Sequence, residues 1–160
     1  MSGGNRTPGD LAFLDICFAE AEVGLAEGGI PIGAVLVGNG EVLSRGHNRR
    51  VQDDDALAHG EIDCIRRAGR RQSYMGLTLY SSAPPCFLCS GAVVQMGIPR
   101  VVTVEQETMP ETRQFLESFG IEVVSLHHDG CLEILDSFIA EHRDIWMEDI
   151  GQYSRDLGRW

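Results

Sequence analysis

The stretch LTLYSSAPPCFLCSGAVVQMGIPRVVTV, residues 77–104, decides the fold class. Short apolar runs at its two ends, Leu77 to Ser81 and Arg100 to Val104, predict strands. The segment between them predicts a helix from Cys86 to Met96. Because a strand, a helix and a second strand in this order form a crossover unit, we expect the two strands to pair in parallel. The stretch therefore predicts an α/β fold.

The segments on either side continue the alternation of helices and strands. We expect a helix from about Ala58 to Arg70 before this stretch, and after it a helix from Glu111 to Phe119, a strand from Glu122 to Leu126, a helix from about Cys131 to His142 and a short helix from Asp144 to Ile150.

The N-terminal third predicts a helix followed by a hairpin. Residues 10–27 carry apolar side chains at helical spacing. Two strand-like runs follow, Ile32 to Val37 and Glu41 to Gly46, and Asn39-Gly40 between them is a strong hairpin signal because both turn positions need a positive φ. We therefore expect residues 1–160 to form one domain. Its predicted architecture is a three-layer α/β/α sandwich with a five-stranded mixed sheet, antiparallel at its start.

Composition and charge narrow the class of partner. Hydrophobic residues make up 43% of the chain and charged residues 23%, as is usual for a soluble globular protein. The longest apolar stretch, residues 30–37, is too short to cross a membrane, and the N-terminus lacks the layout of a secretory signal. We therefore expect a cytoplasmic protein without a membrane partner. The net charge of −11 disfavours nucleic acid as a partner, because the only local basic cluster is Arg66, Arg67, Arg70 and Arg71.

Two short motifs carry residues of the types that bind metal. His59-Gly-Glu61 and Pro85-Cys-Phe-Leu-Cys89 each lie where a helix is expected to begin. A catalytic zinc site has three protein ligands, with a fourth position open to water. His59, Cys86 and Cys89 supply three ligands, and the positive ends of the two helices favour the thiolate form of the cysteines. We therefore predict one Zn²⁺ per chain.

Glu61 is the candidate catalytic residue. It follows His59 by two positions and cannot easily join the same tetrahedron, but its carboxylate can reach a water on the metal. Zinc lowers the pKa of such a water to about 7. A carboxylate beside it can take the proton and pass it to a ring nitrogen and a leaving amine. His-x-Glu followed by Pro-Cys-x-x-Cys is a known signature of zinc deaminases.

Other interpretations of the cysteines stay open. Cys-x-x-Cys alone also fits a redox pair, and a closed structural zinc site would need a fourth ligand from Cys17, Cys64 or Cys131. Cys64 lies five residues after His59, about 140° around a helix, and should not face the same metal. We expect these three cysteines to be small core residues, and we expect the remaining histidines to form ordinary hydrogen bonds.

Beyond these motifs, nearly the whole chain resembles the cytidine deaminase-like superfamily, and most closely its fungal-type cytosine deaminases. The segment that is most telling lies near the C-terminus, because the superfamily at large does not share it. The similar segments are Glu27-Gly-Gly-Ile-Pro-Ile-Gly33, Gly46-His-Asn48, His59-Gly-Glu61, Pro85-Cys-x-x-Cys89, Gly97-Ile-Pro-Arg100 and the C-terminal Trp146-x-Glu-Asp-Ile-Gly151.

The resemblance implies a homodimer with a buried zinc site that accepts a small free base, most closely cytosine, and converts it to uracil and ammonia. It implies that Asn48 and the backbone of Gly60 hold the ring carbonyl and the neighbouring nitrogen. It also implies that Asp149 accepts a hydrogen bond from the exocyclic amine. Trp146 is expected to pack over the ring, on a helix at 144–151 that covers the site.

Three departures from the family pattern reshape one wall of the expected pocket. Pro84 replaces a serine, Phe87 replaces an aspartate, and Met109 replaces an aromatic residue that stacks in the pocket. They make the wall more apolar and leave the reaction type intact. Creatinine, isocytosine and guanine are therefore alternative substrates. Adenosine in tRNA, which the same motif supports, is disfavoured by the charge, and a non-catalytic zinc-stabilised module is the alternative from a different class.

Overall fold

The structure is a computed structural model that describes residues 5–106 and 108–152. The two ends of the predicted domain, residues 1–4 and 153–160, lie outside the described residues. Helices and strands alternate along the chain with these bounds: α1 (Asp10–Ala26), β1 (Gly33–Gly38), β2 (Glu41–His47), α2 (Arg50–Asp53), α3 (Gly60–Ala68), β3 (Leu77–Ser81), α4 (Phe87–Met96), β4 (Arg100–Val104), α5 (Pro110–Ser118), β5 (Glu122–Leu126), α6 (Asp129–Glu141) and α7 (Arg143–Asp149).

A five-stranded sheet of order β2-β1-β3-β4-β5 forms the centre of the molecule. β1 pairs antiparallel with β2 and β3, whereas β3, β4 and β5 pair in parallel. The turn between β1 and β2 has a positive φ at both Asn39 (53°) and Gly40 (76°), as the Asn-Gly sequence predicts. The predicted mixed sheet, antiparallel at its start, is confirmed.

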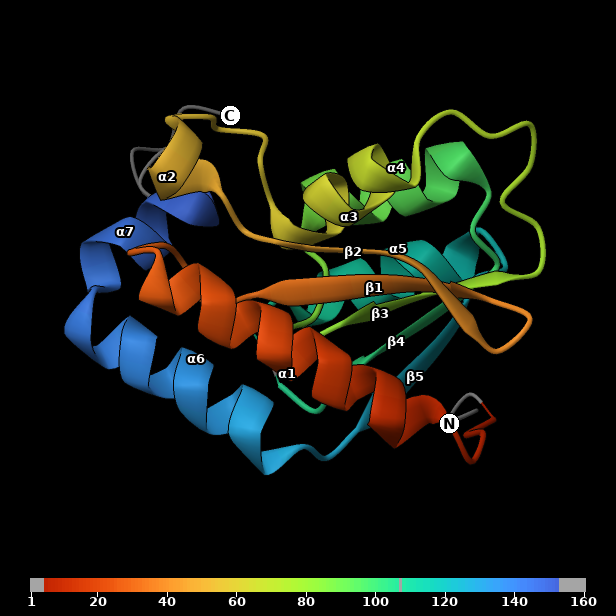
Figure 1. Ribbon diagram of the computed structural model, residues 1–160, viewed down its shortest axis with the longest axis horizontal. Helices are drawn as coiled ribbons and strands as arrows, with labels where there is room; N and C mark the ends of the chain where they lie inside the picture. Colours follow the sequence, from red (N-terminus) through yellow and green to blue (C-terminus); the bar gives the residue numbers. More distant parts are fainter. Residues whose placement is uncertain (1–4, 107, 153–160) are drawn as a thin grey trace.

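Helices cover both faces of this sheet (Figure 1). α1 and α6 lie on one face, and α3, α4 and α5 lie on the other. Because successive strand residues point to opposite faces, β1 contributes Ala34 and Leu36 to the core beneath α3, α4 and α5. The same strand contributes Val35 and Val37 to the core beneath α1 and α6. Two apolar cores separated by one sheet confirm the three-layer α/β/α sandwich.

β3, β4 and β5 have the predicted bounds, whereas the bounds of the other predicted elements differ by one or two residues, and two of these differences matter for the site. The sequence pattern places His59 and Cys86 inside helices, but both have extended backbone, with ψ of 158° and 178°. α3 therefore begins two residues later than predicted and α4 one residue later, and His59 and Cys86 take the N-cap positions. The pattern also misses α2, because a single turn is too short to show a periodic apolar stripe.

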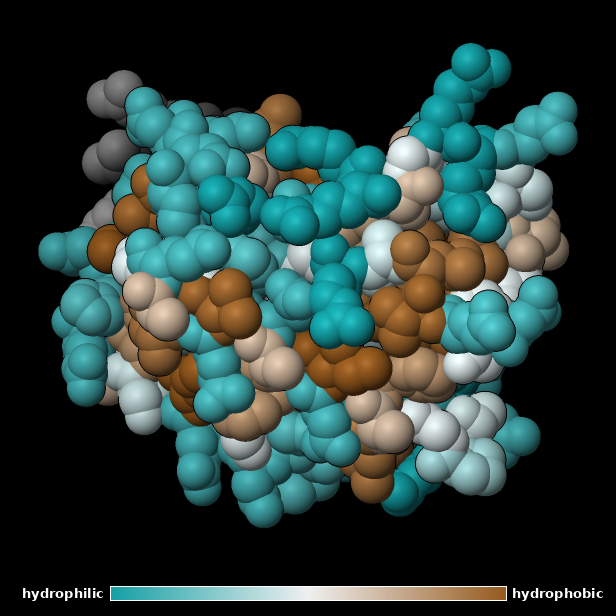
Figure 2. Space-filling view, in the orientation of Figure 1, coloured by the Kyte–Doolittle hydropathy of each residue, from teal (hydrophilic) through white to brown (hydrophobic). Residues whose placement is uncertain are grey.

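The outer surface of α1 and α6 mixes polar and apolar side chains. Figure 2 shows hydrophilic and apolar side chains interspersed across this face. Val23 and Leu25 of α1 are among the exposed apolar residues, whereas charged residues such as Glu133 and Asp136 are exposed on α6. No helix within the described residues is long and apolar enough to cross a membrane.

Gly33, the first residue of β1, allows α1 to lie directly on the sheet. A Cβ atom at this position would overlap the carbonyl oxygen of Cys17 and the backbone nitrogen of Ala21 in α1. We therefore expect Gly33→Ala to lower the free energy of unfolding by about 2 kcal/mol, as overpacking in a well-packed core does. Urea denaturation measures this change.

Gly91 in α4 supplies the matched control. A Cβ atom there meets nothing within 4 Å. Since alanine is favoured over glycine in a helix by about 0.5–1 kcal/mol, Gly91→Ala should leave the protein as stable as before or slightly more stable. Equal effects of the two substitutions would contradict the close approach of α1 and β1.

Candidate metal centre and active site

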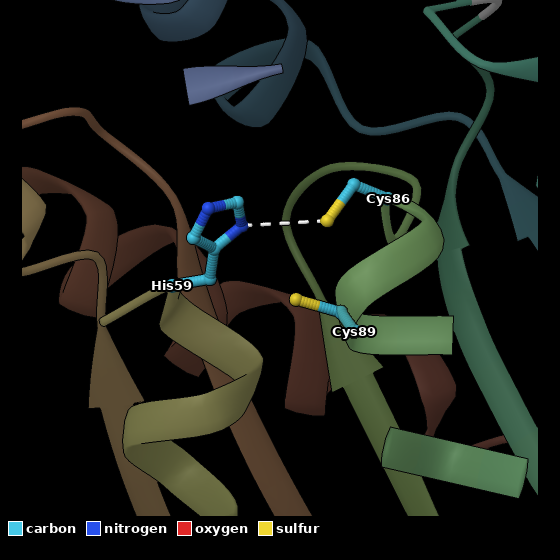
Figure 3. Close-up of side chains that lie close together, drawn as sticks. All are labelled: His59, Cys86 and Cys89. Carbon is cyan, nitrogen blue, oxygen red and sulfur yellow. Dashed lines mark hydrogen bonds between the residues drawn. The ribbon is translucent and has the colours of Figure 1, made fainter. Parts of the chain in front are cut away.

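Two helix N-termini meet at the candidate metal centre. His59 immediately precedes α3, Cys86 immediately precedes α4, and Cys89 lies in the first turn of α4. Their three side chains point toward one another from the two helices (Figure 3). The positive ends of both helix dipoles therefore face the thiol groups, as the sequence motifs predict.

The three donor atoms fit a zinc ion. One ring nitrogen of His59 and the two cysteine sulfurs lie within 4.8 Å of one another, and no other such group occurs among residues 5–106 and 108–152. Nδ1 of His59 is 3.4 Å from Sγ of Cys86. Two ligands of a tetrahedral zinc, with bonds of about 2.1 and 2.3 Å, are separated by about 3.5 Å. Three protein donors of these types form the ligand set of a catalytic zinc site.

The three candidate ligands differ widely in the pKa values of their side chains. Hydrogen bonds from Cys89 and from His59 outweigh burial and lower the pKa of the Cys86 thiol to about 4. Burial and the hydrogen bond with Cys86 raise the pKa of the Cys89 thiol well above its ordinary value. Burial lowers the pKa of His59, but its hydrogen bond with Cys86 and the charge of Asp149 outweigh this and raise it to about 9. Cys86 is thus the thiolate of the pair.

Glu61 lies beside the donors, and both oxygens of its carboxylate have partners. It is the second residue of α3 and is buried. The hydroxyl of Ser81, at the end of β3, donates to Oε1 at 2.9 Å, and the Cys89 thiol donates to Oε2 at 3.2 Å. Burial raises the pKa of Glu61 above its ordinary value. A carboxyl group with a raised pKa can both accept and donate a proton, as general acid–base catalysis requires.

A second carboxylate reaches the site from α7. Oδ1 of Asp149 lies 3.4 Å from Nε2 of His59, and it accepts a hydrogen bond from Nδ2 of Asn48 at 3.1 Å. Burial raises the pKa of Asp149, although the charge of His59 and the bond from Asn48 oppose it. A carboxylate at the outer ring nitrogen of a metal-binding histidine fixes which nitrogen faces the metal. Asp149 is therefore placed to keep Nδ1 of His59 turned toward the cysteines.

A cavity of about 290 Å³ opens beside these groups. Three of the predicted substrate contacts, Phe87, Met109 and Asp149, lie on its wall. The other lining residues are Arg50, Ala56, His59, Cys86, Leu88, Glu148, Ile150 and Gly151.

The remaining predicted contacts lie behind this wall. Asn48 is fully buried and reaches the wall through its hydrogen bond to Asp149. Gly60 begins α3 next to His59, and a Cβ atom there would press on the carbonyl oxygen of Ile32. Trp146 is buried in an apolar cluster of the core and is not among the described residues that line the cavity.

Two residues of the site, Ser81 and Arg50, lie outside the sequence motifs. Ser81 ends a parallel strand three residues before Pro84, and polar residues at the carboxyl ends of such strands commonly face ligand sites. That position is a signal that could have found it. Arg50 lies in α2, for which the sequence gives no helical signal.

The other cysteines and histidines have ordinary partners. Cys17, Cys64 and Cys131 are buried free thiols, and Cys64 contacts the hydroxyl of Ser44. His47 lies between two glutamates, at 2.9 and 3.0 Å. A closed zinc site with a fourth cysteine therefore has no support within the described part of the chain.

Comparison with known proteins identifies the family. Residues 8–105, more than half of the chain, match the family model of the cytidine and deoxycytidylate deaminase zinc-binding region. The chain belongs to this family. It is a zinc-dependent deaminase, a hydrolase that acts on C–N bonds, and the redox interpretation of its cysteines is dropped.

The relatives of the deaminase act on different substrates. It is 36% identical to a cytosine deaminase from Candida albicans over 146 residues, which are 89% of this chain and 97% of the relative. It is 38% identical to a tRNA-specific adenosine deaminase from Streptococcus pyogenes over 93 residues, which are 56% of this chain and 58% of the relative. A guanine deaminase structure from Nitrosomonas europaea shares the fold, with a TM-score of 0.71, 24% identity and coverage of 86% of this chain and 87% of that one.

Zinc binding by the deaminase should release about two protons at pH 7. The ligands must bind as neutral imidazole and thiolates. Cys86, with a pKa of about 4, has already lost its proton at pH 7, whereas His59, with a pKa of about 9, and Cys89 still hold theirs. Apparent zinc affinity should therefore rise steeply between pH 7 and pH 9. Calorimetry in buffers of different ionisation enthalpy counts the protons, and a count of zero would contradict this protonation state.

Proposed function

We propose that the deaminase hydrolyses cytosine to uracil and ammonia. The observation that carries this proposal is the extent of the likeness to a cytosine deaminase, which spans almost the full length of both chains. The likeness to the tRNA-specific relative covers little more than half of either chain. A cavity of about 290 Å³ agrees with a free base, because pockets for larger ligands commonly reach several hundred Å³ more.

Glu61 is the proton carrier of the proposed reaction. Zinc, when bound by His59, Cys86 and Cys89, supplies a Lewis acid that activates water near neutral pH. Glu61 takes a proton from the attacking water and delivers it to the ring nitrogen next to the reacting carbon. A second proton passes through the same carboxyl group to the amine, which leaves as ammonia. The hydrogen bond from Ser81 keeps one oxygen of this carboxylate in a fixed position.

Buried polar groups around the cavity hold the ring in this proposal. Asn48 and the backbone N–H of Gly60 donate to the ring carbonyl, and Asp149 accepts from the exocyclic amine. The hydrogen bond that Asn48 donates to Asp149 supports this arrangement, because it brings both polar side chains to one edge of the cavity. A site with several buried polar groups rejects a ring that leaves them unpaired.

Apolar residues form the rest of the proposed pocket. Met109 and Phe87 contact one face of the ring. α7, which belongs to the same domain as the rest of the site, covers the pocket. Trp146 belongs to that covering helix, and its burial with Leu135 and Phe138 of α6 supports a role in holding α7 against α6. The predicted cytoplasmic location stays a prediction.

A different small ring is the second candidate substrate. Phe87 and Met109, two departures from the cytosine deaminase pattern, both lie on the cavity wall. Guanine, isocytosine and creatinine therefore belong in the first substrate panel. With zinc-loaded protein, we expect the highest kcat/KM for a pyrimidine, and a panel in which only guanine or creatinine releases ammonia would reject cytosine.

Adenosine in tRNA is a weaker candidate. Its support is the likeness to tRNA-specific deaminases. Enzymes that hold a nucleic acid strand need a basic surface, and this chain has a net charge of −11. Within the basic cluster of α3, Arg67 pairs with Asp63 at 2.9 Å, and Arg66 lies 3.7 Å from Asp55. Inosine formation in an anticodon stem-loop would revive this candidate.

The deaminase is also proposed to be a homodimer that uses the outer faces of α4 and α5. Phe87 and Phe119 are 48% and 60% exposed, and the ring of Phe115 links them in a row. Exposed apolar patches of this kind mark protein interfaces. Sedimentation equilibrium measures the mass, and a monomer at micromolar concentration would reject this assembly.

A further inference from the structure

Arg50 brings unpaired hydrogen-bond donors to the wall of the substrate cavity. It is the first residue of α2, and it lines the same cavity as His59 and Asp149. Its Nη2 donates to Oε1 of Glu148 on α7 at 3.3 Å. Its Nε and Nη1 are buried, and neither has a hydrogen-bond partner.

Two buried, unpaired donors on one guanidinium are unusual. A guanidinium remains charged at all ordinary pH values and offers donors in a rigid planar fork. Leaving buried donors without acceptors is costly, and folded proteins rarely do so. The two donors are therefore placed to bind an acceptor that is not part of the described chain.

The cavity wall around Arg50 selects the charge of that acceptor. Glu148 and Asp149, both on α7, line the cavity with Arg50. In the zinc-loaded site His59 is neutral and the two thiolates balance the charge of the metal. The two carboxylates then outnumber the one guanidinium, so a further anion would be repelled. An uncharged acceptor, such as a ring nitrogen or an oxo group, meets both conditions.

We propose that Arg50 is a specificity-determining residue, which donates from Nε and Nη1 to an uncharged acceptor on the ring edge that faces α2 and α7. This inference rests on the proposed function. In that function the amine and the adjacent nitrogen of cytosine meet Glu61 and Asp149, and the carbonyl meets Asn48. The remaining edge of cytosine carries only N–H and C–H groups, so it offers Arg50 no acceptor. Among amino-substituted pyrimidine-like rings, those with an acceptor on that edge, such as 5- or 6-aza analogues of cytosine, should therefore gain relative to cytosine itself.

The test compares isosteric rings. 5-Azacytosine and 6-azacytosine each replace one C–H of cytosine by an uncharged acceptor nitrogen. For each variant, kcat/KM for the better aza ring is divided by kcat/KM for cytosine, and the ratio is compared with that of the wild type, so differences in intrinsic reactivity cancel. We expect Arg50→Met to lower the ratio by about tenfold or more, as loss of hydrogen bonds from a charged donor does. Arg50→Lys, which keeps the charge and loses the fork, should lower it as well.

Glu148→Gln is the control. It weakens the ion pair between α2 and α7 but leaves Nε and Nη1 of Arg50 in place, so the ratio should stay within about twofold of the wild type. A ratio unchanged in both Arg50 variants would overturn the proposal, and so would an equal fall in Glu148→Gln, which would make Arg50 only a link to α7. An Arg50-dependent preference for 5-carboxycytosine would overturn the uncharged class.

Failure of the proposed function is distinguishable from failure of this inference. If wild-type protein turns over none of these rings, calorimetry still compares their binding. Tighter binding of an aza ring than of cytosine, lost in Arg50→Met, would support the role of Arg50 without deamination. Equal binding of all rings by wild type and variant would overturn it.

Discussion

Replacing Glu61 with glutamine lowers kcat for deamination by about a thousandfold and leaves zinc bound. The loss is expected because glutamine keeps the size of the side chain but cannot take up a proton, and general acid–base groups contribute about 10²- to 10⁴-fold to rate. Zinc should stay because the three donors, His59, Cys86 and Cys89, are unchanged. Steady-state kinetics and metal analysis of the same preparation measure both quantities.

Asp63→Asn is the matched control for this substitution. Asp63 lies two residues after Glu61 on α3 and is similarly buried, but its carboxylate faces Arg67 at 2.9 Å. We expect kcat within a few-fold of the wild type, whatever the change in stability. A Glu61→Gln variant that retains wild-type turnover would remove Glu61 from the mechanism and favour a non-catalytic zinc module.

Cys89→Ala should abolish tight zinc binding. Cys89 supplies one of the three donors that the described residues bring together, and its thiol is fully buried. Loss of a residue that merely orients a ligand costs about 10- to 100-fold in metal affinity, so loss of a ligand itself should cost more. Because a bound metal stabilises the folded state, the Tm of the wild type should rise with added zinc, and that of the variant should not.

Cys64→Ala makes a cavity of the same size elsewhere. Cys64 is fully buried in α3 and contacts Ser44, outside the donor group. It should lose some stability through the missing sulfur and keep one zinc per chain. If Cys64→Ala lost zinc and Cys89→Ala kept it, the ligand assignment would be wrong.

Local sequence patterns predicted most of the fold. β3 and β4 have the predicted bounds, and Asn39-Gly40 forms the turn that its residue types require. These features depend on neighbours in the sequence, so a local pattern carries them. The first residues of α3 and α4 were harder to place, because helical spacing continues through His59 and Cys86 although their backbones are extended.

The sequence predicted the part of the candidate site that lies within the two short motifs. His59, Cys86 and Cys89 lie together because two helices begin side by side, an arrangement that their spacing indicates. The contact of Asp149 with His59 joins residues far apart in the chain, and only the resemblance to a family pointed to Asp149. No sequence pattern predicts the role of Arg50. That role follows from the position of Arg50 on the cavity wall and from the lack of acceptors around two of its nitrogens among the described residues.

The most direct test of the account follows the oxygen that replaces the amine. Zinc-loaded protein is incubated with cytosine in water enriched in oxygen-18, and uracil and ammonia are quantified by mass spectrometry and an enzymatic assay. The account predicts equal amounts of both products, one labelled oxygen in each uracil, and loss of the reaction after chelation with recovery when zinc is restored. Absence of labelled uracil and ammonia from cytosine, with zinc bound at one ion per chain, would contradict it.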